Sequence, residues 1–227
     1  MNRFYRVNSK ELAFLQGFAG VILTPWGDTV AHQQPQEMKA CADTLEEKSY
    51  LMQTEKGQYL MEEGLEHLFR IAADATEFLL MSKNNESMET VYFKQDGIAI
   101  FQQQNMNEIE LIWIPVIPLL IGQIANTITP FMNARSDEPK VYPRSEENTI
   151  LIPYREADYQ LQWSFLFYSQ GKLAETIRVF TNGNVQIMVT VDNEHIYIGK
   201  PDKKDMMNAI SQQLIKLHGQ TMREVVS

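Results

Sequence analysis

The side chains that most often bind metals are few in this sequence and widely separated. The four histidines are His32, His67, His195 and His218, and the single cysteine is Cys41. No two histidines lie within one helical turn of each other, and Cys41 has no cysteine or histidine at the spacing of a zinc site. The sequence therefore predicts no metal site.

Motifs of catalysis and of cofactor binding do not occur either. The chain contains no G-x-S-x-G nucleophile motif, no G-x-G-x-x-G dinucleotide motif and no P-loop. Paired glutamates occur at Glu46-Glu47, Glu62-Glu63 with Glu66, and Glu146-Glu147, in charged stretches that are typical of solvated helix faces and linkers. We therefore expect no catalytic residues and no cofactor, and we interpret the protein as a non-enzyme.

The charge balance restricts the class of partner. Lysine and arginine number 20 against 29 aspartates and glutamates, so the net charge is −9. Such a field disfavours nucleic acid and anionic membrane surfaces, and no run of basic residues offsets it. With one cysteine the chain cannot form an internal disulfide, which fits a reducing compartment. These features favour a protein partner or a small ligand.

Two apolar stretches need to be distinguished from membrane or export signals. Basic residues precede the apolar run 12–15, as in a signal peptide. However, Asn8 and Glu11 form a capping box, which predicts the start of an amphipathic helix instead. The apolar run 109–122 is too short to span a bilayer and contains two prolines. We expect a cytoplasmic protein without stable membrane insertion.

The first third of the chain reads as a short strand at 4–7, helices from Asn8 and over 36–48, a small hairpin around Gly57, and a helix over 62–74. Helix, helix, hairpin and helix is the order found in part of a winged helix, which leaves a DNA-binding regulator as an alternative. A recognition helix must present arginine or lysine to DNA. The helix over 62–74 has one arginine among several carboxylates, which disfavours that reading.

A pattern of strands, a hairpin turn and a helix occurs twice in the sequence. The first unit has strands near 78–81, 90–94, 98–102 and 109–113 and a helix over 116–128. The second has strands near 161–168, 175–180, 185–191 and 195–199 and a helix over 202–217. The Asp96-Gly97 and Asn182-Gly183 turn signals lie 86 residues apart, and so do the prolines Pro115 and Pro201. The same offset aligns the apolar stripes of the two helices.

The repeat predicts an α+β protein with pseudo-two-fold symmetry, built from two strand-rich units with an antiparallel sheet and flanking helices. Residues 1–128 form the N-terminal half in this interpretation and residues 161–227 the C-terminal half. Residues 129–160, rich in proline and charge, connect them. We expect the two halves to pack as one compact body.

This layout resembles the EspG-type chaperones of type VII (ESX) secretion and their distant Gram-positive relatives. The resemblance rests on FYRVNSKELAFL at the start, on LMQTEKGQYLMEEGLEHLFRIA, and on ETIRVFTNGNVQIMVTVDNEHIYIGKPDKKDMMNAISQQLI at the end. It implies a cytosolic, non-enzymatic chaperone or adaptor. Such a protein binds a helical substrate of the secretion system and keeps it soluble and export-competent.

The resemblance also implies a contact region. In relatives, the loop between the second and third strands contributes to substrate contact, and here it corresponds to Lys83, Asn84, Asn85, Glu86, Ser87 and Met88. In this chain the loop is short and polar. The alternative from another class is an acidic immunity or regulatory protein that neutralises a toxin by binding it. The sequence does not choose between monomer and dimer.

Overall fold

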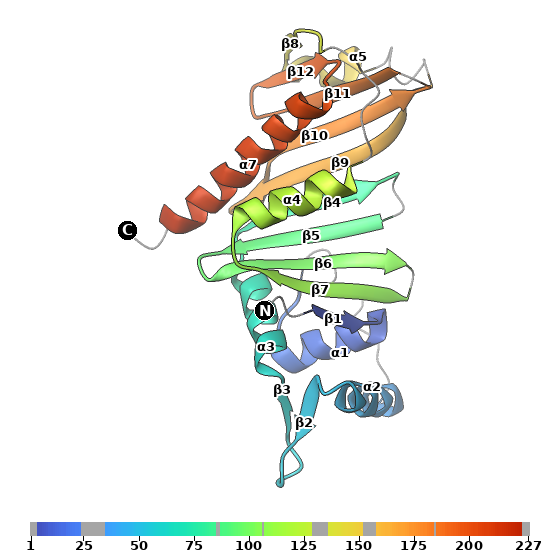
Figure 1. Ribbon diagram of the computed structural model, residues 1–227, viewed down its shortest axis with the longest axis vertical. Coiled ribbons are helices and arrows are strands. Elements are labelled where there is room, and N and C mark those ends of the chain that lie inside the picture. Colours follow the sequence, from blue (N-terminus) through green and yellow to red (C-terminus); the bar gives the residue numbers. More distant parts are fainter. Residues whose placement is uncertain are drawn as a thin grey trace.

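The computed structural model describes residues 4–23, 35–84, 87–105, 107–128, 136–151, 158–183 and 185–223. Figure 1 shows an elongated molecule with one large sheet along its length. In chain order the elements are β1 (Phe4–Val7), α1 (Ser9–Ala19), α2 (Pro35–Glu47), β2 (Leu51–Gln53), β3 (Tyr59–Met61), α3 (Glu63–Asp74), β4 (Glu77–Lys83), β5 (Ser87–Lys94), β6 (Gly97–Asn105), β7 (Glu108–Ile114), α4 (Ile117–Thr127), β8 (Lys140–Pro143), η2 (Arg144–Glu146), α5 (Glu147–Ile150), β9 (Gln160–Ser169), β10 (Lys172–Asn182), β11 (Val185–Val191), β12 (His195–Gly199) and α7 (Lys203–Arg223).

The large sheet has ten strands in the order β1-β7-β6-β5-β4-β9-β10-β11-β12-β8, and every pair of neighbours is antiparallel. This order reads the same from either end once β4 is matched with β9, β5 with β10, β6 with β11, β7 with β12 and β1 with β8. A separate hairpin, β2-β3, projects beyond the sheet as a small wing. The predicted α+β class with pseudo-two-fold symmetry is confirmed.

The register between β4 and β9 locates the pseudo-two-fold axis. Leu80 pairs directly with Leu166, and these residues are 86 positions apart, the offset of the sequence repeat. Leu79 pairs with Phe167 and Met81 with Phe165, so the 86-residue offset converts each of these two pairs into the other. The axis therefore passes through the sheet between Leu80 and Leu166. The helices obey the same offset, because α4 begins at Ile117 and α7 at Lys203.

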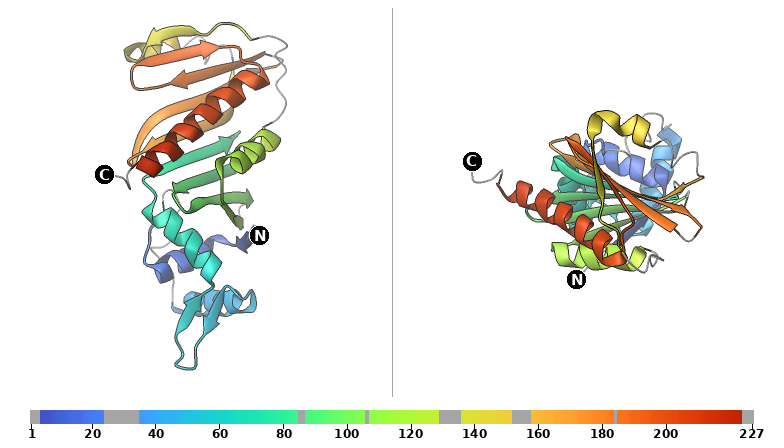
Figure 2. Two further views of the ribbon diagram at one scale, coloured as in Figure 1. Left: turned by 60° about the vertical axis from the view of Figure 1, so that its left-hand side comes forward. Right: turned by 90° about the horizontal axis from the view of Figure 1, so that it is seen from above.

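One face of the sheet is covered by α4 and α7, which lie side by side on it in both views of Figure 2. The core beneath them draws on both units. Matched positions are equally buried: Val91 and Ile177 on the strands, and Ile124 and Ile210 on the helices, are each at most 1% exposed. The alternation along the strands and the helical spacing thus place one shared apolar layer here.

The opposite face is covered differently in the two halves. Helices α1 and α3 pack on the strands of the first half around Leu12, Leu68 and Phe101. In the second half, the part of this cover that the structure describes is the short η2–α5 segment. It packs against β11 and β12, where Leu151 and Ile196 are buried. No helix in the described ranges is long and apolar enough to cross a membrane.

Several local predictions can be compared with these elements. The capping box is confirmed, with the Glu11 N–H donating to Asn8 Oδ1 at 2.9 Å and the Asn8 N–H donating to Glu11 Oε2 at 2.8 Å. Asp202 caps α7, because its Oδ1 accepts from the Asp205 N–H at 2.8 Å. The strand β8 was not predicted, since residues 129–160 were read only as a connection.

The two hairpin glycines are not equivalent, contrary to prediction. The first hairpin closes between Lys94 and Gly97, so Gly97 is the first residue of β6 rather than part of the turn. The second closes between Asn182 and Val185, so Gly183 lies in the loop. Gly97 has a φ of +145°, and a Cβ there would lie 2.3 Å from Trp113 Nε1. That close contact, rather than turn geometry, requires glycine at this position.

Candidate functional site

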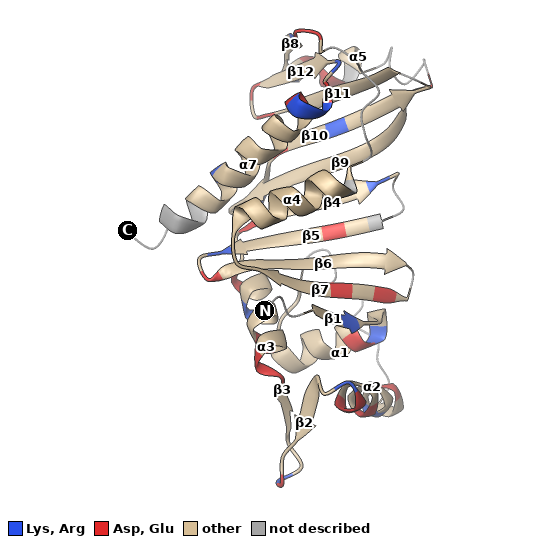
Figure 3. Cartoon of the chain, in the orientation of Figure 1, with Lys and Arg blue, Asp and Glu red and all other residues tan. Residues whose placement is uncertain are grey.

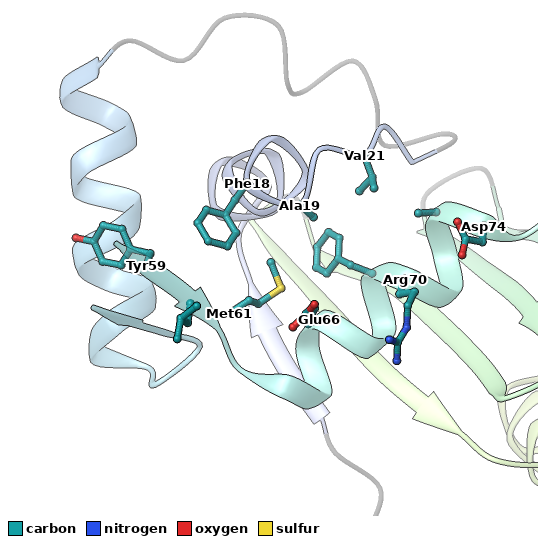
Figure 4. Close-up of a pocket in the computed structure, with 11 residues that line it drawn as sticks. Phe18, Ala19, Val21, Tyr59, Met61, Glu66, Arg70 and Asp74 are labelled. Atoms are coloured by element: carbon teal, nitrogen blue, oxygen red, sulfur yellow. The ribbon is translucent and has the colours of Figure 1, made fainter. Parts of the chain in front are cut away.

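A groove of about 440 Å³ lies at the wing end of the molecule, between the end of α1, strand β3 and helix α3. Its lining is mainly apolar, from Phe18, Ala19, Val21, Tyr59, Leu60, Met61, Phe69 and Ala73, with Glu66, Arg70 and Asp74 along α3. In Figure 4, Phe18, Met61 and Glu66 converge on one space from three elements, whereas Arg70 extends outward from α3. We call this the wing groove.

The end of α1 forms one wall because the chain turns sharply there. Gly20 adopts a left-handed conformation with φ +68°, and its N–H binds the carbonyls of Gln16 and Gly17. Gln16 is fully buried, and its side-chain oxygen accepts from the Leu23 N–H at 2.8 Å. Leu23 is thereby held in the core, while Val21 is left beside the groove. This C-cap ends the helix and presents Phe18 on its exposed side.

Helix α3 forms the other wall and is anchored at its start. Glu62 is its N-cap, accepting from the Leu65 N–H at 2.9 Å and from the Tyr5 hydroxyl at 2.5 Å. Helical spacing then turns Phe69 inward, where it is 1% exposed, and leaves Glu66 and Arg70 on the surface. The groove floor is therefore rigid core, and the charges lie along one rim.

The surroundings of the wing groove expose large apolar side chains. Phe18 is 41% exposed, Leu60 55% and Ile22 77%. On the α3 rim, Asp74 pairs with Lys94, and an Arg70 guanidinium nitrogen lies 2.8 Å from His67 Nδ1. Glu66 makes no ion pair among the described residues. The rim therefore offers the Glu66 carboxylate and, one helical turn away, the Arg70 guanidinium, which contacts His67.

Chemically, this site suits an apolar protein segment better than a reacting substrate. An amphipathic helix binds in an apolar groove through residues spaced like i, i+3, i+4 and i+7, with charges at the rim. In the described part of the chain no three histidine, cysteine or acidic side chains are placed to hold a metal ion. Cys41 is buried in α2, and burial raises the pKa of its thiol. A reactive thiolate is not favoured there.

The predicted contact segment 83–88 lies elsewhere, at one end of the central strands. Lys83 ends β4 and pairs with Ser87, the first residue of β5, and Met88 pairs with Ser82. Lys83, Ser87 and Met88 of the predicted polar loop are therefore strand residues, and Asn84 lies in a turn. Asn84 has a φ of +50°, and its N–H donates to the Gln162 carbonyl at 3.0 Å. Asn85 and Glu86 lie outside the described residues. The contact role of these six residues remains a prediction.

Basic side chains do not gather on the helix that a winged-helix reading would place in DNA. Within α3, Arg70 accompanies Glu63, Glu66 and Asp74. Figure 3 shows acidic bands on α2 and α3 as well as on β7. A surface of this sign repels phosphate. The site residues that the sequence reasoning missed are those of the wing groove, which meet only in the folded chain.

Comparisons with known proteins add the fold relationship. No protein-family model and no curated protein sequence matches the chain. Among solved structures, the Mycobacterium tuberculosis type VII secretion system chaperone EspG5, in complex with the PE25–PPE41 dimer, matches over 95% of this chain and 96% of that chain. The TM-score is 0.67 and the sequence identity 10%. This chain has the EspG5 fold. The match spans nearly the whole of both chains.

Proposed function

We propose that the protein is a non-enzymatic, cytoplasmic chaperone or adaptor that binds a helical substrate of a type VII secretion system. In this role it keeps the substrate soluble and competent for export. The observation that carries the proposal is the likeness to EspG5, which covers both chains almost completely. At 10% identity that likeness is one of fold, so the proposed function rests on the fold together with the surface of the wing groove.

The wing groove supplies a surface of the right kind for such a client. Its apolar floor and exposed rim residues match an amphipathic helix, whose apolar face is insoluble when left uncovered. Glu66 and Arg70, one turn apart on α3, favour a client helix that carries a cation and a carboxylate at the same spacing. The segment 83–88 stays a second predicted contact. PE–PPE-like pairs are one example of a helical client.

Co-expression tests the function. The chain is produced with each small helical protein encoded near its gene, and the complex is purified through a tag on the client. We expect a soluble stoichiometric complex with at least one client, and less soluble client without the chaperone. Failure with every such candidate would contradict the proposed function. Rescue of cells from a toxin, with no effect of deletion on secretion, would instead support the immunity alternative.

A matched pair of variants tests the surface separately. Leu60→Asp places a charge in the wing groove, and Val141→Asp changes a residue of similar exposure, 55% against 54%, on the distant strand β8. A charge in an apolar contact costs about 2 kcal/mol, so Leu60→Asp should weaken client binding by about thirtyfold. Val141→Asp should leave it unchanged. Equal binding by both variants contradicts the groove assignment but not the chaperone function.

A further inference from the structure

A second, much smaller cavity of about 40 Å³ lies beside the segment 83–88, on the side of the sheet that carries α4 and α7. Met81, Ser82, Lys83, Met88, Glu89, Gln102 and Trp163 line it. A water molecule needs roughly 10–15 Å³ measured in this way. The cavity therefore takes one or a few waters, or the head of one side chain, and excludes a ring or a helix.

Two polar side chains that line this cavity are buried and have no partner among the described residues. Glu89 is 7% exposed and lies between Met81 of β4 and Gln102 of β6, and its carboxyl makes no hydrogen bond or ion pair with any described residue. Trp163 is 3% exposed, and its Nε1–H has no acceptor. Burial alone raises the pKa of Glu89 to about 7. Native proteins rarely leave buried donors and acceptors unpaired.

The pseudo-symmetric position shows that this arrangement is specific to one half. Glu175 lies 86 residues after Glu89 and is also buried, at 9% exposed, with its pKa raised to about 7 mainly by burial. There, however, Lys216 of α7 lowers the pKa and Asp192 raises it, so Glu175 sits among other charges. Glu89, by contrast, lines the same cavity as Trp163, whose indole N–H is unpaired among the described residues.

The two groups select a ligand by their chemistry. Trp163 offers a donor, and Glu89 offers an acceptor whose carboxylate form repels anions. A cation is disfavoured because the Lys83 ammonium already lies 5.4 Å from the Trp163 ring centre. A neutral planar group with a carbonyl at one end and an NH₂ at the other satisfies both. We propose that this cavity binds the side-chain carboxamide of an asparagine or glutamine on a protein partner.

This site goes beyond the proposed function, and its test needs no client. The full chain is labelled with ¹⁵N at the indoles of its three tryptophans, and acetamide is titrated while the indole N–H signals are followed by NMR. The Trp163 signal, assigned with Trp163→Phe, should move and saturate. Trp113 is an internal control, because its Nε1 is also buried and unpaired but does not line this cavity. N,N-dimethylacetamide, which lacks N–H donors, should produce no saturating shift.

Matched variants make the result decisive. Glu89→Leu should weaken acetamide binding by at least about tenfold, the effect of losing one charge-assisted hydrogen bond, whereas Glu175→Leu should change it less than about twofold. In the unaltered chain, binding should tighten as the pH rises through about 7, because a carboxylate accepts more strongly than a carboxylic acid. No saturation at Trp163, equal binding by Glu89→Leu, or a pH-independent affinity would each overturn the proposal and indicate a structural water only.

Discussion

The two halves of this protein share a sheet-and-helix framework but differ in what covers the opposite face. In the first half, α1, α2, the β2-β3 wing and α3 enclose a core, and the end of α1, β3 and α3 form the wing groove. In the second half, the described cover is the short η2–α5 segment over Leu151 and Ile196. The shared parts serve the fold in both halves. The parts present in one half alone are therefore where a specific function is best sought.

The outer edges of the sheet show the same contrast. On β1, the Arg6 N–H donates to the Tyr50 hydroxyl at 3.0 Å, and Lys48 Nζ binds the Arg6 carbonyl at 3.3 Å. Side chains from the added elements thus satisfy that edge. On β8, a strand of four residues ends at Pro143 and is preceded by Pro139, and proline offers no N–H to a further strand. Both are ways to prevent edge-to-edge association.

The largest expected effect tests whether the core between sheet and helices is common to both halves. Phe165 and Leu79 are fully buried, symmetry-related members of that core. Phe165→Ala should reduce the free energy of unfolding by about 3–5 kcal/mol and Leu79→Ala by about 2–5 kcal/mol. Urea unfolding followed by both far-UV circular dichroism and tryptophan fluorescence should give one coincident transition for each variant. Separate transitions for the two halves would contradict a common core.

The next largest effect is on the pH dependence of the free energy of unfolding, to which Glu89 and Glu175 contribute. Their pKa values are raised from 4.5 to about 7 in the folded chain, so the native state binds more protons than the unfolded state between these values. Stability should therefore fall as the pH rises through this window, by about 3 kcal/mol for Glu89 and by less for Glu175, whose carboxyl is closer to solvent and to Lys216, and stay constant above it.

Replacement of either glutamate checks this expectation. Glu89→Gln should remove the larger part of the decrease between about pH 4.5 and pH 7 and Glu175→Gln the smaller part, as measured by urea unfolding. The double variant should show almost none of it. An unchanged pH slope in either single variant shows that its carboxyl titrates normally in the folded protein.

The smallest effect on stability compares the N-cap residues of α4 and α7. Asp202 caps α7 with its side chain, whereas the matching residue of α4, Val116, makes no side-chain cap bond and is 48% exposed. Asp202→Ala should cost about 1 kcal/mol, and Val116→Asp should stabilise by about 0.5–1 kcal/mol. Thermal melting of both variants measures the difference. A melting temperature that is unchanged by Asp202→Ala counts against capping there.

Much of the fold could be predicted from the sequence, because its signals are local. The apolar alternation along the strands, the capping box at Asn8 and the 86-residue offset all survive in the structure. The strand β8 was missed because KVYP is short and lies between prolines, which are normally absent from strands. The hairpin turns were misplaced by one residue, because the register follows cross-strand packing such as that of Trp113 over Gly97.

The candidate site could be predicted far less well. The wing groove joins Phe18, Met61 and Phe69 from three elements, and no local pattern shows that they meet. Glu89 did carry a signal, since the offset of 86 leads from it to another glutamate, Glu175, inside apolar strands. Two matching carboxyls at core positions mark a buried polar site. The six-residue segment 83–88 remains a prediction that only a client complex can test.

The pairing of Leu80 with Leu166 has a consequence for the order of folding. The two central strands, β4 and β9, are the first strands of their units, so their contact closes a loop that contains the rest of the first unit and all of the connection. Contacts so distant in sequence form slowly. During synthesis the first half must therefore wait with the apolar edge of β4 unpaired. That interval is when the nascent chain is most exposed to aggregation.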